Sequence, residues 1–368
     1  MRRLLIDAQS SVATWTVSRY WLKCHIHGDL RHPMHKAAIL AFDGCSASSL
    51  GGFADLLQVA NSHLLQQQGS AAKMFEWRFV SLTGAPILAS NGLRLEAASI
   101  DAHMYFDLIF IPSLYYPGRE AFDRIIGELN SACSWLSAQW RAGSVIAANC
   151  SGTFILASTG LLDERIATTT WWLEEQFRSR FPRVHLQIDP VITEADRLIC
   201  AGASASYLLQ AIHVIERFSG PSIASLCAKT MLIDVSQTKQ TPFLPLLTDK
   251  DHADSLVHKA QHWLQKNMSK DVSMRELAHE LGVSERTLIR RFNTALGQSP
   301  ISYLQDLRIE AARGLLEAGN LTVGRVAEQI GYLDTSSFSR LFKEKVGWSP
   351  GAYRNRFKPA GNIKSGDS

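Results

Sequence analysis

Residues 277–303 read LAHELGVSERTLIRRFNTALGQSPISY, and residues 326–353 read VAEQIGYLDTSSFSRLFKEKVGWSPGAY. The two segments align at an offset of 49 residues up to Gly331 and at an offset of 50 residues after it. The one extra residue falls in a turn, where insertions are tolerated best. A match of this length identifies an internal duplication.

The first copy has the spacing of a helix-turn-helix motif. Ser273 and Glu276 form a capping box that opens a first helix, and Gly282 allows the left-handed turn that ends it. Ser284 then caps a second helix, which turns Leu288 toward a core. The outward positions of that second helix are Arg286, Thr287, Arg290 and Arg291.

The second copy repeats this arrangement. Thr322 caps its first helix and Gly331 makes the turn, after which Asp334 or Thr335 opens the second helix. The inward positions of this helix are Phe338, Leu341 and Phe342. Its exposed positions are Thr335, Ser336, Ser337, Ser339 and Arg340.

The two outward faces predict a DNA-binding surface. A short helix with a polar, arginine-bearing face fits the major groove, where arginine clamps guanine and hydroxyls bond bases or phosphates. The candidate DNA-binding residues are Ser284, Arg286, Thr287, Arg290, Arg291, Thr335, Ser336, Ser337, Ser339 and Arg340. One such helix pair would equally suit a plain αα-hairpin. Two copies joined by a long helix over residues 303–316 favour DNA binding.

The charge distribution agrees with an anionic partner for the last third of the chain. Residues 1–250 carry 21 basic and 21 acidic side chains, whereas residues 251–360 carry 16 basic and 12 acidic ones. The whole net charge of +4 therefore lies in the part that holds the repeat.

The repeat resembles the AraC/XylS-type DNA-binding domain. The resemblance rests on Leu277-Ala278, on Arg286 to Phe292, on two G-x-S-P motifs, on Phe338-x-Arg340-x-Phe342 and on Tyr353-Arg354. It implies an all-α domain over residues 251–358, with seven helices and two helix-turn-helix motifs. It also implies that the two motifs enter neighbouring major-groove segments on one face of DNA.

The chain before the repeat alternates short apolar runs with helical patterns. We expect strands at residues 37–42, 77–80, 108–112 and 144–148, and helices at residues 50–61 and 121–142. Strands that are apolar on both faces indicate a mostly parallel sheet covered by helices on both sides. This predicts an α/β domain over residues 34–235, followed by a polar, proline-containing linker over residues 236–250.

This first domain resembles the DJ-1/PfpI domain, and more closely the version fused to AraC-type domains in GlxA-type transcriptional regulators. The residues that carry the likeness are Asp43-Gly44, Asp55, Ala148 to Gly152, Ala167 to Trp171, Ala201-Gly202 and Gln240 to Phe243. The resemblance implies a flavodoxin-like fold of the class I glutamine amidotransferase type. It also implies control by a small, nitrogen-containing metabolite.

The DJ-1/PfpI resemblance places Cys150 at the position of a nucleophile. Enzymatic members of that family add a carboxylate and a histidine to activate such a cysteine. Ser151 and Thr170 stand where histidines are usual, and Asp55 stands where a glutamate is usual. We therefore expect no catalysis, and we interpret Asp55, Cys150, Ser151 and Thr170 as candidate ligand-binding residues.

Three functions fit these observations. We favour a ligand-responsive transcriptional regulator that forms a homodimer, binds double-stranded promoter DNA and responds to a small-molecule effector, with RNA polymerase as a further candidate partner. One alternative is a constitutive DNA-binding regulator whose α/β domain is only a dimerisation scaffold. The other is an amidase or hydrolase that depends on Cys150.

The remaining sequence features bear on cofactors and location. The six cysteines lie far apart without C-x-x-C spacing, so we expect no metal, no cofactor and reduced thiols. No stretch approaches the roughly 18 apolar residues of a membrane span, which excludes an integral membrane protein. The reduced thiols fit a cytoplasmic protein, and we expect a bacterial one. Residues 1–33 are interpreted as an extension that is disordered or precedes a true start at Met34, and residues 359–368 as a disordered tail.

Overall fold

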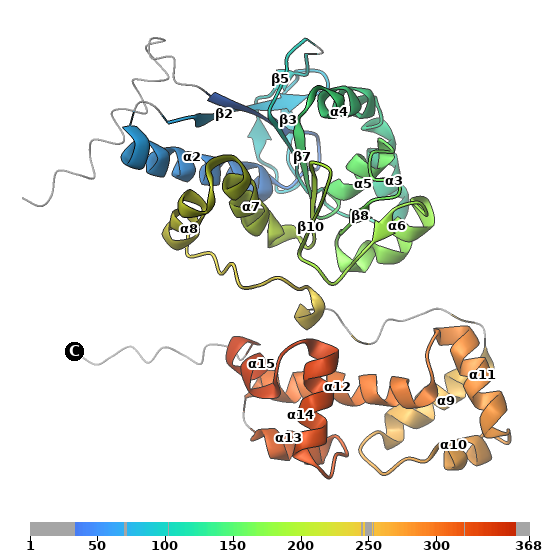
Figure 1. Ribbon diagram of the computed structural model, residues 1–368. Helices are drawn as coiled ribbons and strands as arrows, with labels where there is room; N and C mark the ends of the chain where they lie inside the picture. The colour runs from blue at the N-terminus through green and yellow to red at the C-terminus, as the bar shows by residue number, and fades with distance from the viewer. Residues whose placement is uncertain are drawn as a thin grey trace, which may run out of the picture. The chain divides into compact units, whose positions relative to one another are not determined.

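The computed structural model describes residues 34–69, 72–101, 103–243, 246, 252, 254–319 and 321–357 (Figure 1). It divides into two compact units, with the boundary between Thr238 and Lys239. The division falls inside the segment that the sequence predicts as a linker. The expectations for residues 1–33 and 359–368 lie outside the described residues.

The first unit is built on a seven-stranded sheet with the order β10-β11-β7-β6-β1-β2-β5. These strands are β1 (Met34–Leu40), β2 (Met74–Ser81), β5 (Ala98–Ser99), β6 (Leu108–Ile111), β7 (Val145–Asn149), β10 (Ile192–Ala195) and β11 (Leu198–Ala201). All neighbours run parallel except β10, which is antiparallel to β11. The two strands at the centre, β6 and β7, are buried along their whole length. The predicted parallel sheet is confirmed.

Two short ladders lie outside this sheet. They are formed by β3 (Ile87–Leu88) with β4 (Arg94–Leu95), and by β8 (Ile166–Ala167) with β9 (His185–Leu186).

Helices cover both faces of the sheet, as the apolar strands require. One layer contains α2 (Ala47–Gln68), α7 (Tyr207–Ser219) and α8 (Pro221–Thr230), and the other contains α3 (Arg119–Glu128), α4 (Ser131–Ala142) and α5 (Gly152–Ser158) (Figure 1). The first layer is anchored by Phe53 of α2, which stacks on Phe110 of β6 with ring centroids 3.9 Å apart. The unit also contains α6 (Glu174–Arg180) and short 3-10 helices at Trp171–Leu173 and Ser204–Ser206.

The prediction of one continuous helix over residues 121–142 is wrong. The structure has α3 and α4 there, separated by Leu129 and Asn130. The break occurs because the backbone bonds shift from i−4 to i−3 partners, with Asn130 donating to Gly127 and Cys133 donating to Asn130. Gly127 and Asn130 are both weak helix formers, which lets the chain turn at this point.

The second unit holds a short 3-10 helix at Thr241–Phe243 and, within residues 254–357, the seven α-helices that the resemblance to AraC/XylS-type domains implies. They are α9 (Ser255–Asn267), α10 (Met274–Glu280), α11 (Glu285–Leu296), α12 (Pro300–Ala318), α13 (Val323–Gln329), α14 (Thr335–Val346) and α15 (Pro350–Phe357). Their buried side chains form two clusters, one for each copy of the repeat. Helix α12 contributes its first half to one cluster and its second half to the other.

Candidate DNA-binding surface and ligand pocket

Both helices of the first helix-turn-helix begin at the N-caps that the sequence predicts. The Ser273 hydroxyl accepts a hydrogen bond from the Glu276 amide at 3.0 Å, and the Ser284 hydroxyl accepts one from the Thr287 amide at 3.2 Å. Gly282, between α10 and α11, has a φ of 66°, in the left-handed region that favours glycine. Local interactions therefore fix where α11 begins.

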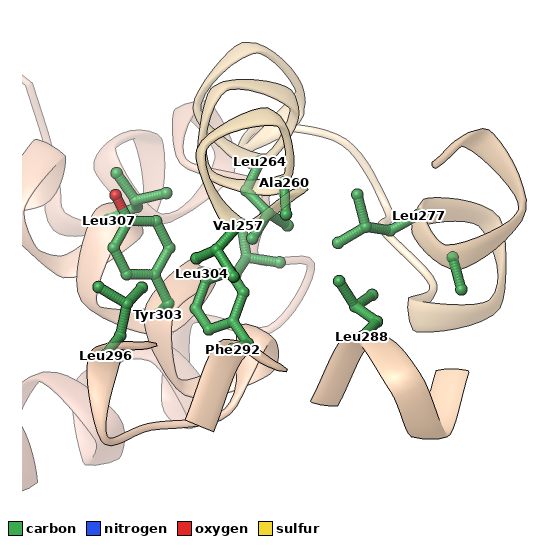
Figure 2. Close-up of a cluster of buried hydrophobic side chains, with 11 residues drawn as sticks. Val257, Ala260, Leu264, Leu277, Leu288, Phe292, Leu296, Tyr303, Leu304 and Leu307 are labelled. Atoms are coloured by element: carbon green, nitrogen blue, oxygen red, sulfur yellow. The ribbon is translucent and has the colours of Figure 1, made fainter. Parts of the chain in front are cut away.

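A single buried cluster holds α11 by its inner face. Figure 2 shows side chains of α9, α10, α11 and α12 meeting in this cluster, with Leu288 and Phe292 contributed by α11. The rings of Phe292 and Tyr303 pack edge to face with centroids 5.4 Å apart. Because the inner face of α11 is buried in this cluster, the opposite face of the helix is exposed.

The second motif is built in the same way but begins differently. Asp334 is the cap of α14, since its carboxylate accepts hydrogen bonds from the amides of Ser336 at 3.1 Å and Ser337 at 2.8 Å. A hydrogen bond from the Ser337 side chain to the same carboxylate contributes most to lowering the pKa of Asp334 below its usual range, and the two amide bonds add to it. Phe338 and Phe342 are buried in the second cluster, as predicted.

Most of the predicted DNA-binding side chains lie on outward faces. Arg286 and Arg290 are exposed on α11, four residues apart and so on one side of the helix. On α14, Thr335, Ser336 and Arg340 are exposed. The half-buried members of the set are Thr287, Ser337 and Ser339, while Ser284 is exposed but uses its hydroxyl as a cap. Contact of any of them with DNA stays a prediction.

Arg291 has a structural partner instead. Its Nε and Nη2 donate to the two carboxylate oxygens of Asp254, at 2.7 and 2.5 Å. Asp254 also caps α9 by accepting from the amides of Leu256 and Val257. The guanidinium lowers the pKa of Asp254 to about 2. This position argues against the predicted DNA contact and assigns Arg291 to holding α9 against α11.

Sequence reasoning missed three side chains on the outer face of α11. Ile289, Asn293 and Thr294 line a shallow hollow together with Arg286 and Arg290. The signal that could have found them is their helical spacing of three, seven and eight residues from Arg286.

The first unit has a sharp strand-to-helix turn at Cys150, between β7 and α5. Cys150 follows β7, has a φ of 54°, and donates its amide to the carbonyl of Ala201 at 2.8 Å. A residue with a side chain rarely adopts this conformation, so the surrounding structure must hold it there. The Cys150 side chain is 3% exposed, and burial raises the pKa of its thiol to about 11. At neutral pH the group is therefore a protonated thiol rather than a nucleophilic thiolate.

Cys150 and Ser151 border a cavity of about 310 Å³ at this turn. The wall consists of hydroxyl-bearing, aromatic and apolar side chains, namely Ser46, Ser90, Ser113, Leu114, Tyr115, Tyr116, Cys150, Ser151, Trp172, Leu173 and Ser204. None of these lining residues carries a formal charge at neutral pH. The hydroxyl of Ser151 both donates to the carbonyl and accepts from the amide of Leu114, each at 2.9 Å, so it fixes one wall.

The other two predicted ligand-binding residues do not line this cavity. Thr170 is fully buried beside the Cys150 thiol. Asp55 lies exposed on α2 near Tyr207, whose pKa is raised first by burial and then by the charge of Asp55. The aromatic lining residues Tyr115, Tyr116 and Trp172 were not anticipated, because Tyr115 and Tyr116 lie on a loop and Trp172 on a 3-10 helix of three residues, too short to show a periodic pattern.

The described part of the chain contains no group of three or more His, Cys, Asp or Glu side chains arranged to hold a metal ion. None of the helices resolved there is long and apolar enough to cross a membrane.

Comparisons with known proteins match these two units. A family model described as a helix-turn-helix domain matches residues 277–356. The chain is similar to the HTH-type transcriptional regulator CdhR of Pseudomonas aeruginosa, with 25% identity over 76% of this chain and 81% of that protein. It is also similar to the HTH-type transcriptional regulator GbdR of the same species, with 26% identity over 84% of this chain and 82% of that protein.

Among solved structures, Drosophila melanogaster DJ-1beta is similar over 55% of this chain and 99% of its own, with 18% identity and a TM-score of 0.46. The helix-turn-helix match spans both copies of the repeat, and the parallel sheet with a cysteine at its strand-to-helix turn precedes it. The second unit is therefore an AraC-type helix-turn-helix domain, and it follows a first unit with an α/β fold built on a mostly parallel sheet.

Proposed function

We propose that this chain is a sequence-specific DNA-binding transcriptional regulator of the AraC/GlxA type. The observation that carries the proposal is the duplicated motif. Helices α11 and α14 each pack on a hydrophobic cluster of their own, and each exposes an arginine at the matching positions Arg290 and Arg340. The named transcriptional regulators to which the chain is similar over most of its length support the same function.

The two motifs are joined rigidly enough to read DNA at a fixed spacing. Helix α12 passes through both buried clusters, and its Asp306 pairs with Lys345 of α14 at 2.7 Å. Arg308 of α12 donates to the carbonyls of Met268 at 2.7 Å and Lys270 at 2.6 Å, which ties the first motif to the same helix. We therefore expect a target with two half-sites whose spacing cannot vary freely.

The cavity beside Cys150 supports an effector site. It is large enough for a small metabolite, and its hydroxyls and aromatic rings offer hydrogen bonds and π faces without a fixed charge. A nitrogen-containing cation could lie against the partly exposed rings of Tyr115 and Trp172 by cation–π attraction. The protonated, buried Cys150 thiol supports a binding role over catalysis.

The partners and the location follow from this proposal. The DNA partner is a double-stranded promoter, and the regulator binds it as a homodimer. RNA polymerase is the machinery such a regulator would contact. The regulator would work in the bacterial cytoplasm, where promoters are accessible.

The proposed DNA binding is tested by selection from a pool of randomised DNA duplexes with the full-length protein. We expect enrichment of a sequence with two half-sites, and footprinting should show protection on one face of the helix. Retention of duplexes without any sequence enrichment would contradict sequence-specific regulation.

The proposed effector site is tested by thermal unfolding of the full chain against amines, amino acids and related small nitrogen compounds. A ligand at 100 times its dissociation constant adds about 2.7 kcal/mol, which raises the unfolding temperature of the first unit. The shift should disappear in Trp172→Ala and persist in Tyr105→Ala, a control that removes an exposed aromatic ring outside the cavity. A panel without any shift would favour the scaffold function of this unit.

A further inference from the structure

The outer face of α11 carries an aliphatic side chain between two arginines. Ile289 is 38% exposed, while its neighbour Leu288 is fully buried in the core cluster. Ile289 is absent from the side chains that pack on that cluster. It lies instead in the shallow hollow that it shares with Arg286 and Arg290.

These side chains form one stripe along the helix. Arg286, Ile289, Arg290 and Asn293 are spaced by three, one and three residues, which places them on the same side of α11. From Arg286 to Asn293 the helix rises about 10 Å at 1.5 Å per residue. At about 3.4 Å per base pair, the stripe therefore spans about three base-pair steps.

The chemistry of the stripe differs at each position. Arginine pairs with the two acceptors of guanine, and asparagine pairs with the acceptor and donor of adenine. An isoleucine can do neither, because it has no hydrogen-bonding group. The C5-methyl group of thymine is the apolar feature that a major groove offers, and an aliphatic side chain gains by covering it.

The second motif has no aliphatic side chain at the position that matches Ile289. The residue that matches Ile289 in the repeat is Ser339, which is polar and half-buried on α14. The residue that matches Asn293 is Lys343, which is exposed. The two recognition helices thus differ in their apolar content, although their cores are built alike.

We propose that Ile289 is a specificity-determining residue that recognises the C5-methyl group of a thymine in the half-site bound by α11. This inference rests on the proposed DNA-binding function. It assigns a methyl-dependent base contact to the first motif only, because Ser339 offers no aliphatic surface of that size at the matching position of α14.

The test replaces thymine by deoxyuridine, one position at a time, in the sequence that the full-length protein selects. This change removes only the methyl group. We expect the wild-type protein to lose about fourfold in affinity at one thymine of one half-site, the factor that corresponds to one buried methyl group. The Ile289→Ala variant should bind the thymine duplex more weakly and show no difference between thymine and deoxyuridine at that position.

The matched control is Ile301→Ala. Ile301 is 45% exposed on α12, outside the stripe, so its variant should keep the fourfold discrimination. An Ile289→Ala protein that keeps the full deoxyuridine penalty would overturn the assignment, as would a wild-type protein indifferent to every thymine methyl in its site. Failure to select any sequence would instead contradict the proposed function itself. Thermal unfolding of each variant verifies that it is folded.

Discussion

Residues that look equivalent in the sequence have different roles in the structure. Arg290 and Arg291 are neighbours with the same charge, yet one is exposed and the other is bonded to Asp254 through two donors. Consecutive residues on a helix point about 100° apart, so one can face DNA while the next contacts its own domain. The sequence around Arg290 and Arg291 could not show which of them is bonded within the domain, because Asp254 lies 37 residues away in the sequence.

Arg290 and Arg340 should affect specific binding more than general affinity. If each clamps a guanine, its alanine variant should lose about 1–3 kcal/mol on the selected sequence and much less on random duplexes. Titration of both duplexes at one salt concentration measures the difference. Arg78→Ala, which removes an exposed arginine from β2 of the first unit, is the charge control and should bind as the wild type does. An equal loss on both duplexes would reassign that arginine to phosphate contact.

The ion pair between Asp254 and Arg291 makes a pH-dependent contribution to stability. The pKa of Asp254 is lowered from 3.8 to about 2, so the folded state gains stability above pH 3.8 and loses it as the pH falls toward 2. Asp254→Asn keeps a residue that caps helices well but removes the charge. Thermal unfolding should show the variant destabilised at pH 6 and approaching the wild type as the pH falls below 2. A difference that stays constant over this range would exclude the ion pair as its source.

At the scale of single elements, the structure shows which boundaries depend on local interactions. The caps Ser273 and Ser284 bond to amides three residues on, so the sequence predicts them correctly. The break between α3 and α4 depends on a shift of backbone bonding partners near Asn130, which hydrophobic periodicity does not report. Apolar residues continue on both sides of the break, and the pattern therefore reads as one helix.

Helix α5 begins under a tight steric restriction that can be tested by substitution. A Cβ added at Gly152 would overlap the carbonyl oxygen of Pro112, and it would lie 2.9 Å from that of Ile111. Gly152→Ala should therefore destabilise the protein by about 1–3 kcal/mol, as overpacking in a core does. It should also displace the Cys150 turn that borders the cavity.

Gly127→Ala is the matched control for this substitution. Gly127 lies in α3 with nothing within 4 Å of an added Cβ, and alanine is the better helix former there. Denaturant unfolding should therefore show an unchanged or slightly higher stability for this variant. Equal effects of the two substitutions would mean that contact with Pro112 does not restrict α5.

At the scale of the whole molecule, the segment predicted as a linker is partly a structural element. Arg313 of α12 is 5% exposed and donates to the carbonyl of Pro242 at 2.7 Å and to that of Thr241 at 3.3 Å. Phe243 packs edge to face on Trp348 and Phe357. The polar composition of residues 236–250 indicates a linker, but the buried arginine that binds this segment lies about 70 residues further on. A linear sequence pattern does not reveal such a partner.

The second unit should therefore need residues before 251 for its full stability. A fragment of residues 251–368 leaves the Arg313 guanidinium without its carbonyl partners, whereas a fragment of residues 239–368 keeps them. Arg313 keeps its ion pair with Glu310 at 2.7 Å in both fragments, but each lost hydrogen bond to its charged group costs about 1.5–3 kcal/mol. At roughly 3–5 °C per kcal/mol for a fragment of this size, the shorter fragment should unfold roughly 10 °C or more below the longer one.

Arg313→Met in both fragments identifies the cause of this difference. Methionine removes the charge but keeps an apolar side chain of similar length. It should destabilise the longer fragment strongly, because it breaks the bonds to Thr241 and Pro242, and it should destabilise the shorter one much less, because only the ion pair with Glu310 is lost there. If the substitution changes both fragments equally, residues 239–250 do not act through Arg313. The packing of Phe243 on Trp348 and Phe357 would then account for any remaining difference in unfolding temperature.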